Sequence, residues 1–201
     1  MSGVPSEPVE GIEAFAEGQS QAAPVWVTKG AEAFPDLRGR YLFGTAKIEG
    51  VKDAGRDPAR LDSFFRTVDA VNETLRTLAR SVVDAYGKAV LAKPLDDASF
   101  NELTVRCAAK AAEALGVEEG LLETYFDEKT KTMHAILLVE VCVGDEYDTL
   151  LRYSVFLAFN EELEPVHKAN GLKGDAKAAS SYLSDLVRAE GVKVGLDCWK
   201  K

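Results

Sequence analysis

The sequence contains few of the residues from which metal centres and catalytic sites are usually built. Among its 201 residues are three cysteines and two histidines. Cys107, Cys142 and Cys198 show no CxxC spacing, and so sparse and odd a set predicts neither a disulfide framework nor a zinc site. It favours a reducing compartment. We expect Cys107 and Cys142 to act as small buried hydrophobic residues, because both lie in apolar segments.

Long apolar runs and clusters of positive charge are also scarce. The longest apolar run, "AILLVEVCV" at 135–143, is too short to cross a bilayer. The N-terminal segment "MSGVPSEPVEGIEAFAEG" carries acids where a signal peptide has a basic start. A formal net charge of -9 argues against nonspecific binding to nucleic acid. We therefore expect no membrane span and no nucleic-acid partner. The predicted location is the cytoplasm, or the cell envelope if an export signal has been removed.

The rest of the composition is that of a globular protein. Hydrophobic residues make up 46% and charged residues 28% of the chain, which is enough to bury a core. Residues 1–23 are rich in small and polar residues and are predicted to form a flexible leader or docking arm. Trp26 and Phe34 should then attach the end of this leader to the folded body. A short strand is expected at 40–49.

The most regular pattern in the chain predicts a long helix from 58 to 91, with Asp57 as its N-cap. Its apolar residues recur at alternating spacings of four and three: Phe64, Val68, Val71, Leu75, Leu78 and Val82. Such spacing fits either packing across a sheet or a coiled-coil seam. We favour packing across a sheet of the same domain, because predicted strands flank the helix in the sequence.

A second helix and a hairpin are predicted next. The helix should begin at Ser99, which can form a capping box with Glu102, and end at Gly116. The segments "LLETYF" and "TMHAILLVEVCV" on either side of "DEKTK" are typical of a β-hairpin. The second strand of this hairpin is apolar on both faces and is therefore expected to be the central strand of the sheet.

The last part of the chain gives weaker signals. Residues 145–163 fit either a helix or a strand, and we favour a helix. The segment "GDAKAASSYLSDLVRAEG" is bounded by two glycines and predicts another helix. The segment "VKVGLDCW" at 192–199 is predicted to close the chain as a short strand.

No constellation of residues predicts catalysis, a cofactor or a metal. His134 and His167 have no partner at metal-ligand spacing. His134 and Cys142 on one strand would lie about 26 Å apart, too far for a nucleophile and its base. The acids of "DEYD" and "NEELE" lack the pattern of a calcium loop, and "GLKGD" lacks the Walker pattern. We therefore predict that the protein is not an enzyme.

The order of these elements resembles the bacterial twenty-kilodalton lipoprotein family, whose relatives include lipoproteins of flagellar basal disks. The likeness covers residues 24–143 and includes "YLFGTA", "AEALGV" and "LLETYFDEKTKTMHAILLVEV". The matching positions are Trp26, Tyr41, Gly44, Ala46, Ala59, Leu78, Tyr125 and Leu137. The resemblance implies helices against a small antiparallel sheet and a role in envelope or flagellar assemblies. The chain departs from the family in lacking a lipid-carrying N-terminal cysteine and in extending past the hairpin.

Together these observations predict an α+β protein with a small antiparallel sheet packed against long amphipathic helices. Its parts are a leader (1–23), a core domain (24–143) and a helical extension with a terminal strand (144–201). The function we expect is assembly without catalysis, through self-association or a protein partner. The interaction residues predicted for this role are Trp26, Phe34, Tyr41 and Trp199.

The alternative is a small-molecule-binding module with an apolar cleft between sheet and helix. Four aromatic residues are candidates to line such a cleft: Tyr41, Tyr125, Phe126 and Tyr153. Aromatic residues at these spacings more often fill a core.

Overall fold

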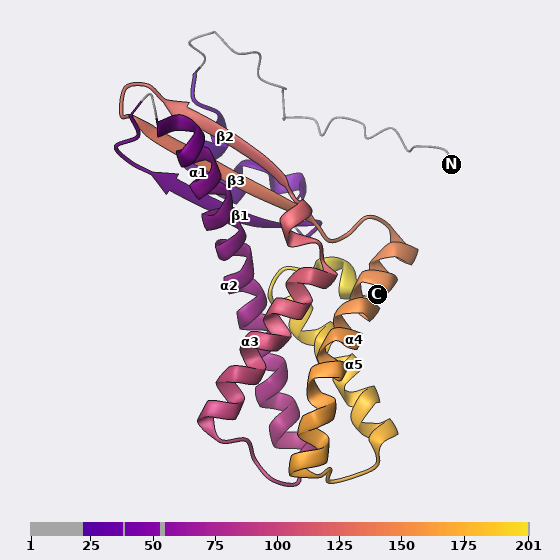
Figure 1. Ribbon diagram of the computed structural model, residues 1–201. Helices are drawn as coiled ribbons and strands as arrows, with labels where there is room; N and C mark the ends of the chain where they lie inside the picture. Colours follow the sequence, from indigo (N-terminus) through magenta and orange to yellow (C-terminus); the bar gives the residue numbers. More distant parts are fainter. Residues whose placement is uncertain (1–21, 38, 53–54, 201) are drawn as a thin grey trace, which may run out of the picture.

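The fold is α+β, as predicted. The computed structural model describes residues 22–37, 39–52 and 55–200. Figure 1 shows an elongated molecule with a sheet at one end and a bundle of helices at the other, and the long helix α2 runs from the sheet into the bundle. The predicted leader falls almost entirely on residues 1–21, which lie outside the described residues.

Over the described residues the chain forms five α-helices and one three-stranded sheet. The helices are α1 (Val25–Lys29), α2 (Arg56–Val90), α3 (Asp97–Ala114), α4 (Asp145–Asn170) and α5 (Ala176–Lys193). The strands are β1 (Tyr41–Ile48), β2 (Leu121–Asp127) and β3 (Thr132–Glu140). The described residues also include four short 3-10 turns: η1 (Gly30–Ala33), η2 (Pro35–Leu37), η4 (Val117–Glu119) and η5 (Asp197–Lys200).

The hairpin and its central strand are confirmed. The sheet is antiparallel throughout, with the strand order β1-β3-β2. Because successive side chains of a strand point to opposite faces, β3 presents Leu137 to α2 and the neighbouring Ile136 and Leu138 to Trp26 of α1. A central strand covered on both faces must be apolar on both faces, and this is the pattern that its sequence carries.

Helix α2 lies unusually close to β1. A Cβ atom on Gly44 would come within 2.0 Å of the carbonyl oxygen of Thr67, so only glycine fits at this point of the strand. The helix presents small buried side chains here, since Ala59, Ser63 and Thr67 follow one another at intervals of four. The hydroxyls of Ser63 and Thr67 donate to carbonyl oxygens three residues earlier, which satisfies both in the dry contact.

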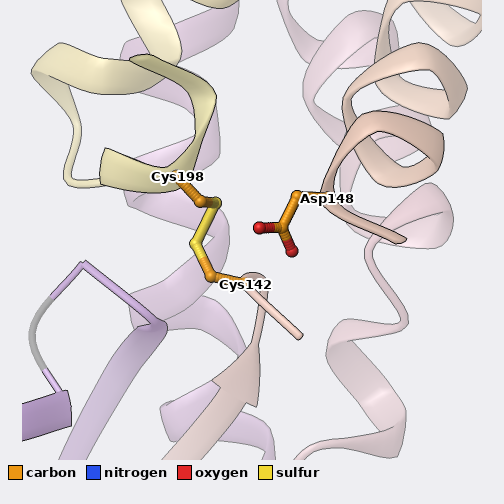
Figure 2. Close-up of side chains that lie close together, drawn as sticks. All are labelled: Cys142, Asp148 and Cys198. Atoms are coloured by element: carbon orange, nitrogen blue, oxygen red, sulfur yellow. A yellow bond between two sulfur atoms is a disulfide. The ribbon is translucent and has the colours of Figure 1, made fainter. Parts of the chain in front are cut away.

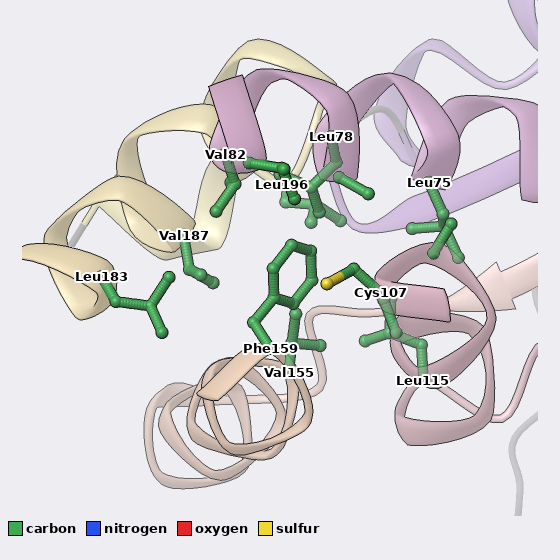
Figure 3. Close-up of a cluster of buried hydrophobic side chains, with 14 of the residues drawn as sticks. Leu75, Leu78, Val82, Cys107, Leu115, Val155, Phe159, Leu183, Val187 and Leu196 are labelled. Carbon is green, nitrogen blue, oxygen red and sulfur yellow. The ribbon is translucent and has the colours of Figure 1, made fainter. Parts of the chain in front are cut away.

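The other half of α2 forms the core of the helical bundle. Figure 3 shows side chains from four helices meeting around the ring of Phe159. The labelled residues are Leu75, Leu78, Val82, Cys107, Leu115, Val155, Phe159, Leu183, Val187 and Leu196. This core therefore joins residues 24–143 to the extension 144–201, and the stripe of α2 packs against both the sheet and the other helices.

Several predicted boundaries are wrong. Helix α2 begins at Arg56, so Asp57 lies in its first turn and is not the N-cap. Helix α3 begins at Asp97, and its cap is Asp96, whose side chain accepts a hydrogen bond from the backbone N–H of Ser99. The capping box at Ser99 is therefore not formed, because an earlier acid already occupies the capping position.

The prediction of a helix after residue 144 is confirmed, and α4 is longer than expected. The predicted final strand is wrong. Helix α5 continues through Gly191 to Lys193, and the chain then turns into η5. Gly191 therefore lies inside the helix and does not end it. A glycine is needed at this position because a Cβ would lie 2.2 Å from the ring carbon Cε3 of Trp199.

Candidate functional site

Helix α4 carries two apolar faces. One face is turned into the bundle, where Val155, Phe159 and Leu163 recur every four residues and are fully buried. The opposite face of its N-terminal half carries four large exposed side chains, which we call the α4 stripe. Its members and their exposed fractions are Tyr147 (52%), Leu150 (59%), Tyr153 (54%) and Leu157 (45%). Their spacings of three and four residues place them along one side of the helix.

The α4 stripe is as large as the largest apolar patch that a typical monomeric protein exposes, about 300–600 Å². At about 200 Å² for a whole side chain of this size, its four members expose about 400 Å². Monomeric proteins rarely expose a larger contiguous apolar patch, and such patches often mark binding surfaces. Acids stand beyond its two ends, at Glu146 and Glu161. The sequence shows an excess of apolar residues here, because "YDTLLRYSVFL" is too apolar for a helix with a single buried face, but it does not separate the inner face from the outer one.

A second feature lies where β3 leads into α4. Cys142 forms a disulfide with Cys198 of η5, and the two residues are 56 positions apart in the sequence. This pair overturns the prediction that the cysteines form no disulfide. Their spacing gave no signal, because the contact depends on how the extension folds back onto the sheet. Cys107 is free and buried in the bundle, where burial raises the pKa of its thiol to about 12.

Asp148 lies beside this disulfide and holds the start of α4. Its Oδ1 accepts hydrogen bonds from the backbone N–H groups of Val143, at 2.7 Å, and Gly144, at 3.0 Å. Figure 2 shows its carboxylate directed toward the two sulfur atoms. The acids of "DEYD" were not predicted to form a site. One of them, Asp148, has a structural role, because it binds the two backbone N–H groups that precede α4.

At the far end of the bundle, Tyr86 and His167 form a partly enclosed polar pair. The hydroxyl of Tyr86 lies 2.8 Å from Nε2 of His167, and the two rings stack. Burial raises the pKa of Tyr86 to about 12 and lowers the pKa of His167. Both groups are therefore neutral near pH 7, and the hydroxyl can donate to Nε2 of the tautomer that carries its proton on Nδ1.

The four predicted interaction residues lie mainly in the chain's own core. Trp26 is 8% exposed and packs on Ile136 and Leu138 of β3, so it attaches α1 to the sheet as predicted. Phe34 and Tyr41 are partly buried against the same cluster. Trp199 is fully buried. That these residues contact a partner stays a prediction, and the structure does not bring all four together.

The aromatic residues considered for a ligand cleft are dispersed. Tyr41 and Tyr125 pack on the α1 face of the sheet, whereas Phe126 lies beneath the guanidinium of Arg56 at 4.2 Å. Tyr153 belongs to the α4 stripe. His134, also weighed as a catalytic residue, lies beside Tyr125 with ring centroids 6.3 Å apart.

Three hollows of ligand size occur in the described part of the chain. The largest of these, of about 710 Å³, lies between α2 and the start of α3 and is mostly polar, and the remaining two are more apolar. One, of about 400 Å³, lies between α1 and the sheet, and its lining includes Trp26, Lys47 and His134. It lies between a helix and the sheet but is not purely apolar, and the helix is the short α1, which the sequence did not predict. The other, of about 360 Å³, lies between α2 and the end of α3. Its lining includes Asn72, whose Oδ1 is buried and has no hydrogen-bond partner among the residues that the structure describes.

Comparison with models of protein families, with characterised proteins and with solved structures found no match for this chain. The described helices include none with the length and apolar character needed to cross a membrane. Function must therefore be argued from the surfaces and side chains themselves.

Proposed function

We propose that the protein is a non-enzymatic assembly protein that associates with copies of itself through the α4 stripe. The exposed second apolar face of α4 carries this proposal. Leaving Leu150 and Tyr153 in water is unfavourable, and burial of such side chains is the main favourable term in protein association. Tyrosine is enriched at interfaces because its ring is apolar while its hydroxyl tolerates a polar rim.

The size of the stripe fits a second copy of the chain. A standard interface buries about 800 Å² on each partner, and its centre is apolar. An apolar area of about 400 Å² can supply that centre, with the remainder coming from the polar residues around it. A two-fold axis places the same patch against itself, so no second surface is required. If the two helices cross steeply near Leu150, the acids Glu146 and Glu161 of the two copies stay apart.

The setting we propose is an oxidising compartment, such as the cell envelope of a bacterium. The Cys142–Cys198 disulfide supports this setting, because such bonds persist mainly outside reducing compartments. The resemblance to the twenty-kilodalton lipoproteins points in the same direction. This proposal replaces the expectation of a reducing compartment, which rested on the absence of a disulfide.

Sedimentation velocity on two matched variants tests the interface. Leu150 and Leu61 are both leucines on helices, and both are 59% exposed, but Leu61 lies on α2 outside the stripe. We expect Leu150→Lys to weaken self-association at least tenfold, or by about 1.4 kcal/mol, because it places a charge in the apolar centre. Leu61→Lys should leave the association constant unchanged. Equal effects of the two changes would refute the α4 stripe as the interface.

The hollow beside Asn72 favours a second candidate function, the binding of a small molecule. A ligand with one hydrogen-bond donor and an apolar body would satisfy the buried Oδ1 of Asn72 and contact Val68 and Ala112. This function predicts that particular amines or amides raise the melting temperature of the chain. The rise should be lost in Asn72→Leu, and a rise that persists in this variant would place the ligand elsewhere.

A further inference from the structure

Three metal-ligating side chains meet at the junction of β3, α4 and η5. The sulfurs of Cys142 and Cys198 and a carboxylate oxygen of Asp148 all lie within 4.8 Å of one another. No other group of three such side chains occurs in the described part of the chain. In Figure 2 the carboxylate approaches the sulfur pair from the first turn of α4, while Cys142 lies in the loop after β3 and Cys198 lies in η5.

The two sulfurs are bonded to each other, so they must separate before they can act as ligands of a tetrahedral zinc site. With Zn–S bonds of about 2.3 Å and a Zn–O bond of about 2.1 Å, neighbouring ligand atoms lie about 3.5–3.8 Å apart. The Cα atoms of Cys142 and Cys198 are 5.8 Å apart. Once the bond between the sulfurs is opened, rotation of the two side chains can separate the sulfurs without a large backbone movement. The carboxylate oxygen of Asp148 already lies within 4.8 Å of both sulfurs.

We propose that the reduced chain binds one zinc ion through the thiolates of Cys142 and Cys198 and the carboxylate of Asp148. A dithiol reductant first donates two electrons and two protons to the disulfide, and becomes a disulfide itself. Zn²⁺ then displaces the two thiol protons, which are released to water. Water takes the fourth position in this proposal, because all three side chains are only partly buried.

The surroundings already orient the carboxylate ligand. The two backbone N–H groups that donate to Oδ1 of Asp148 fix the plane of its carboxylate, as outer-shell donors do in zinc sites. The sulfur of Cys142 lies 2.8 Å from the carbonyl oxygen of Gly39. In the disulfide, the sulfur of Cys142 has no proton to donate to this oxygen. In the reduced chain without metal, the thiol of Cys142 can donate to it, and the metal then displaces the thiol proton.

The consequence is that the C-terminal turn is held to the end of β3 in both redox states. The disulfide holds it under oxidising conditions, and zinc holds it under reducing conditions. This inference does not depend on self-association through the α4 stripe, so the two can fail separately.

The test uses the untagged full-length chain, reduced and kept free of oxygen, with Co²⁺ or Zn²⁺ as the only added metal. We expect one Co²⁺ per chain with thiolate-to-cobalt charge-transfer absorption, and Zn²⁺ should displace it. Zn²⁺ should also raise the melting temperature of the reduced chain and leave that of the oxidised chain unchanged. A folded, reduced chain that binds no Co²⁺ or Zn²⁺ would overturn the proposal.

Four variants assign the ligands. Cys142→Ser and Cys198→Ser should each abolish the charge-transfer band at stoichiometric Co²⁺. Asp148→Asn should lower zinc affinity at least about tenfold, measured by competition with a chromophoric chelator. Asp197→Asn is the matched control, because Asp197 adjoins Cys198 in sequence but pairs with Lys200, and it should bind zinc like the native chain. Equal affinities of the Asp148 and Asp197 variants would exclude the carboxylate as a ligand.

Discussion

The hydroxyl of Tyr86 lies 2.8 Å from Nε2 of His167, and this contact joins the C-terminal parts of α2 and α4. Helix α2 runs from the sheet into the bundle, where α4 lies among the other helices (Figure 1). The polar pair links the two helices near their C-terminal ends. While His167 is neutral, the hydroxyl of Tyr86 can donate to Nε2. In the protonated imidazole Nε2–H donates to the Tyr86 oxygen instead, and the hydroxyl proton loses this acceptor.

The first prediction concerns acid pH. Burial lowers the pKa of His167 in the folded state, and the carboxylate of Glu164 only partly offsets this. The unfolded chain therefore binds the proton more readily. The stability contributed by neutral His167 is fully present above the unfolded pKa of about 6.5 and is lost as the pH falls through the lower, folded pKa.

Urea unfolding between about pH 7.5 and pH 5 measures this effect, and stability should fall over that range. His167→Gln should make the fall shallower, because glutamine does not titrate. Burial also lowers the pKa of His134, so His134→Gln should reduce the remaining slope. A slope in His167→Gln as steep as in the native chain would show that His167 does not contribute.

The second prediction concerns the close approach of β1 and α2. Gly44→Ala should destabilise the fold by about 3 kcal/mol, because the new methyl group meets the backbone of Thr67, which cannot move without shifting α2. Gly87→Ala is the matched control, since Gly87 lies inside the same helix with nothing within 4 Å of the added Cβ. It should stabilise by about 0.5–1 kcal/mol. Chemical unfolding of both variants gives the comparison, and equal effects would contradict the close packing.

The third prediction counts thiols. The native oxidised chain should show no thiol reactive toward a disulfide reagent, because Cys107 is buried and its pKa is raised to about 12. Unfolding without reduction should expose one thiol, and unfolding with reduction should expose all three cysteines. Three thiols on unfolding alone would show that Cys142 and Cys198 are not joined.

The fourth prediction concerns the strength of this covalent link. A bond between residues 56 positions apart restricts the unfolded chain and should contribute about 4 kcal/mol at 25 °C. Cys142→Ser with Cys198→Ser should lower the free energy of unfolding by about that amount, measured in urea without added metal. Cys107→Ala should leave the disulfide intact and lose only the packing of one small side chain. A double variant as stable as the native chain would mean that the link contributes nothing.

The sequence predicted those elements whose pattern reflects one dominant environment. Helix α2 has a single regular stripe, and β3 is apolar on both faces because both are covered, so each pattern identifies its element. The predictions that failed concern positions where a tertiary contact determines the local structure. Gly191 has the appearance of a helix stop, but in the fold it accommodates the ring of Trp199.

The candidate sites were less predictable than the fold. The contact between Cys142 and Cys198 requires that the extension fold back onto the sheet, and no local pattern specifies that. The α4 stripe was hidden for a different reason. Its apolar residues mixed with those of the buried face, so the segment fitted a strand as well as a helix. Only the position of Phe159 in the core distinguishes the inner face from the outer one.

The fifth prediction is the central one, that copies of the chain associate through the outer face of α4. Light scattering behind size exclusion measures the mass of the oxidised full-length chain over a wide range of concentration. We expect a discrete multiple of 21.8 kDa that dissociates on dilution, and a shift toward the single chain when Tyr153 and Leu150 are both changed to lysine. A mass of 21.8 kDa at every concentration would contradict the account.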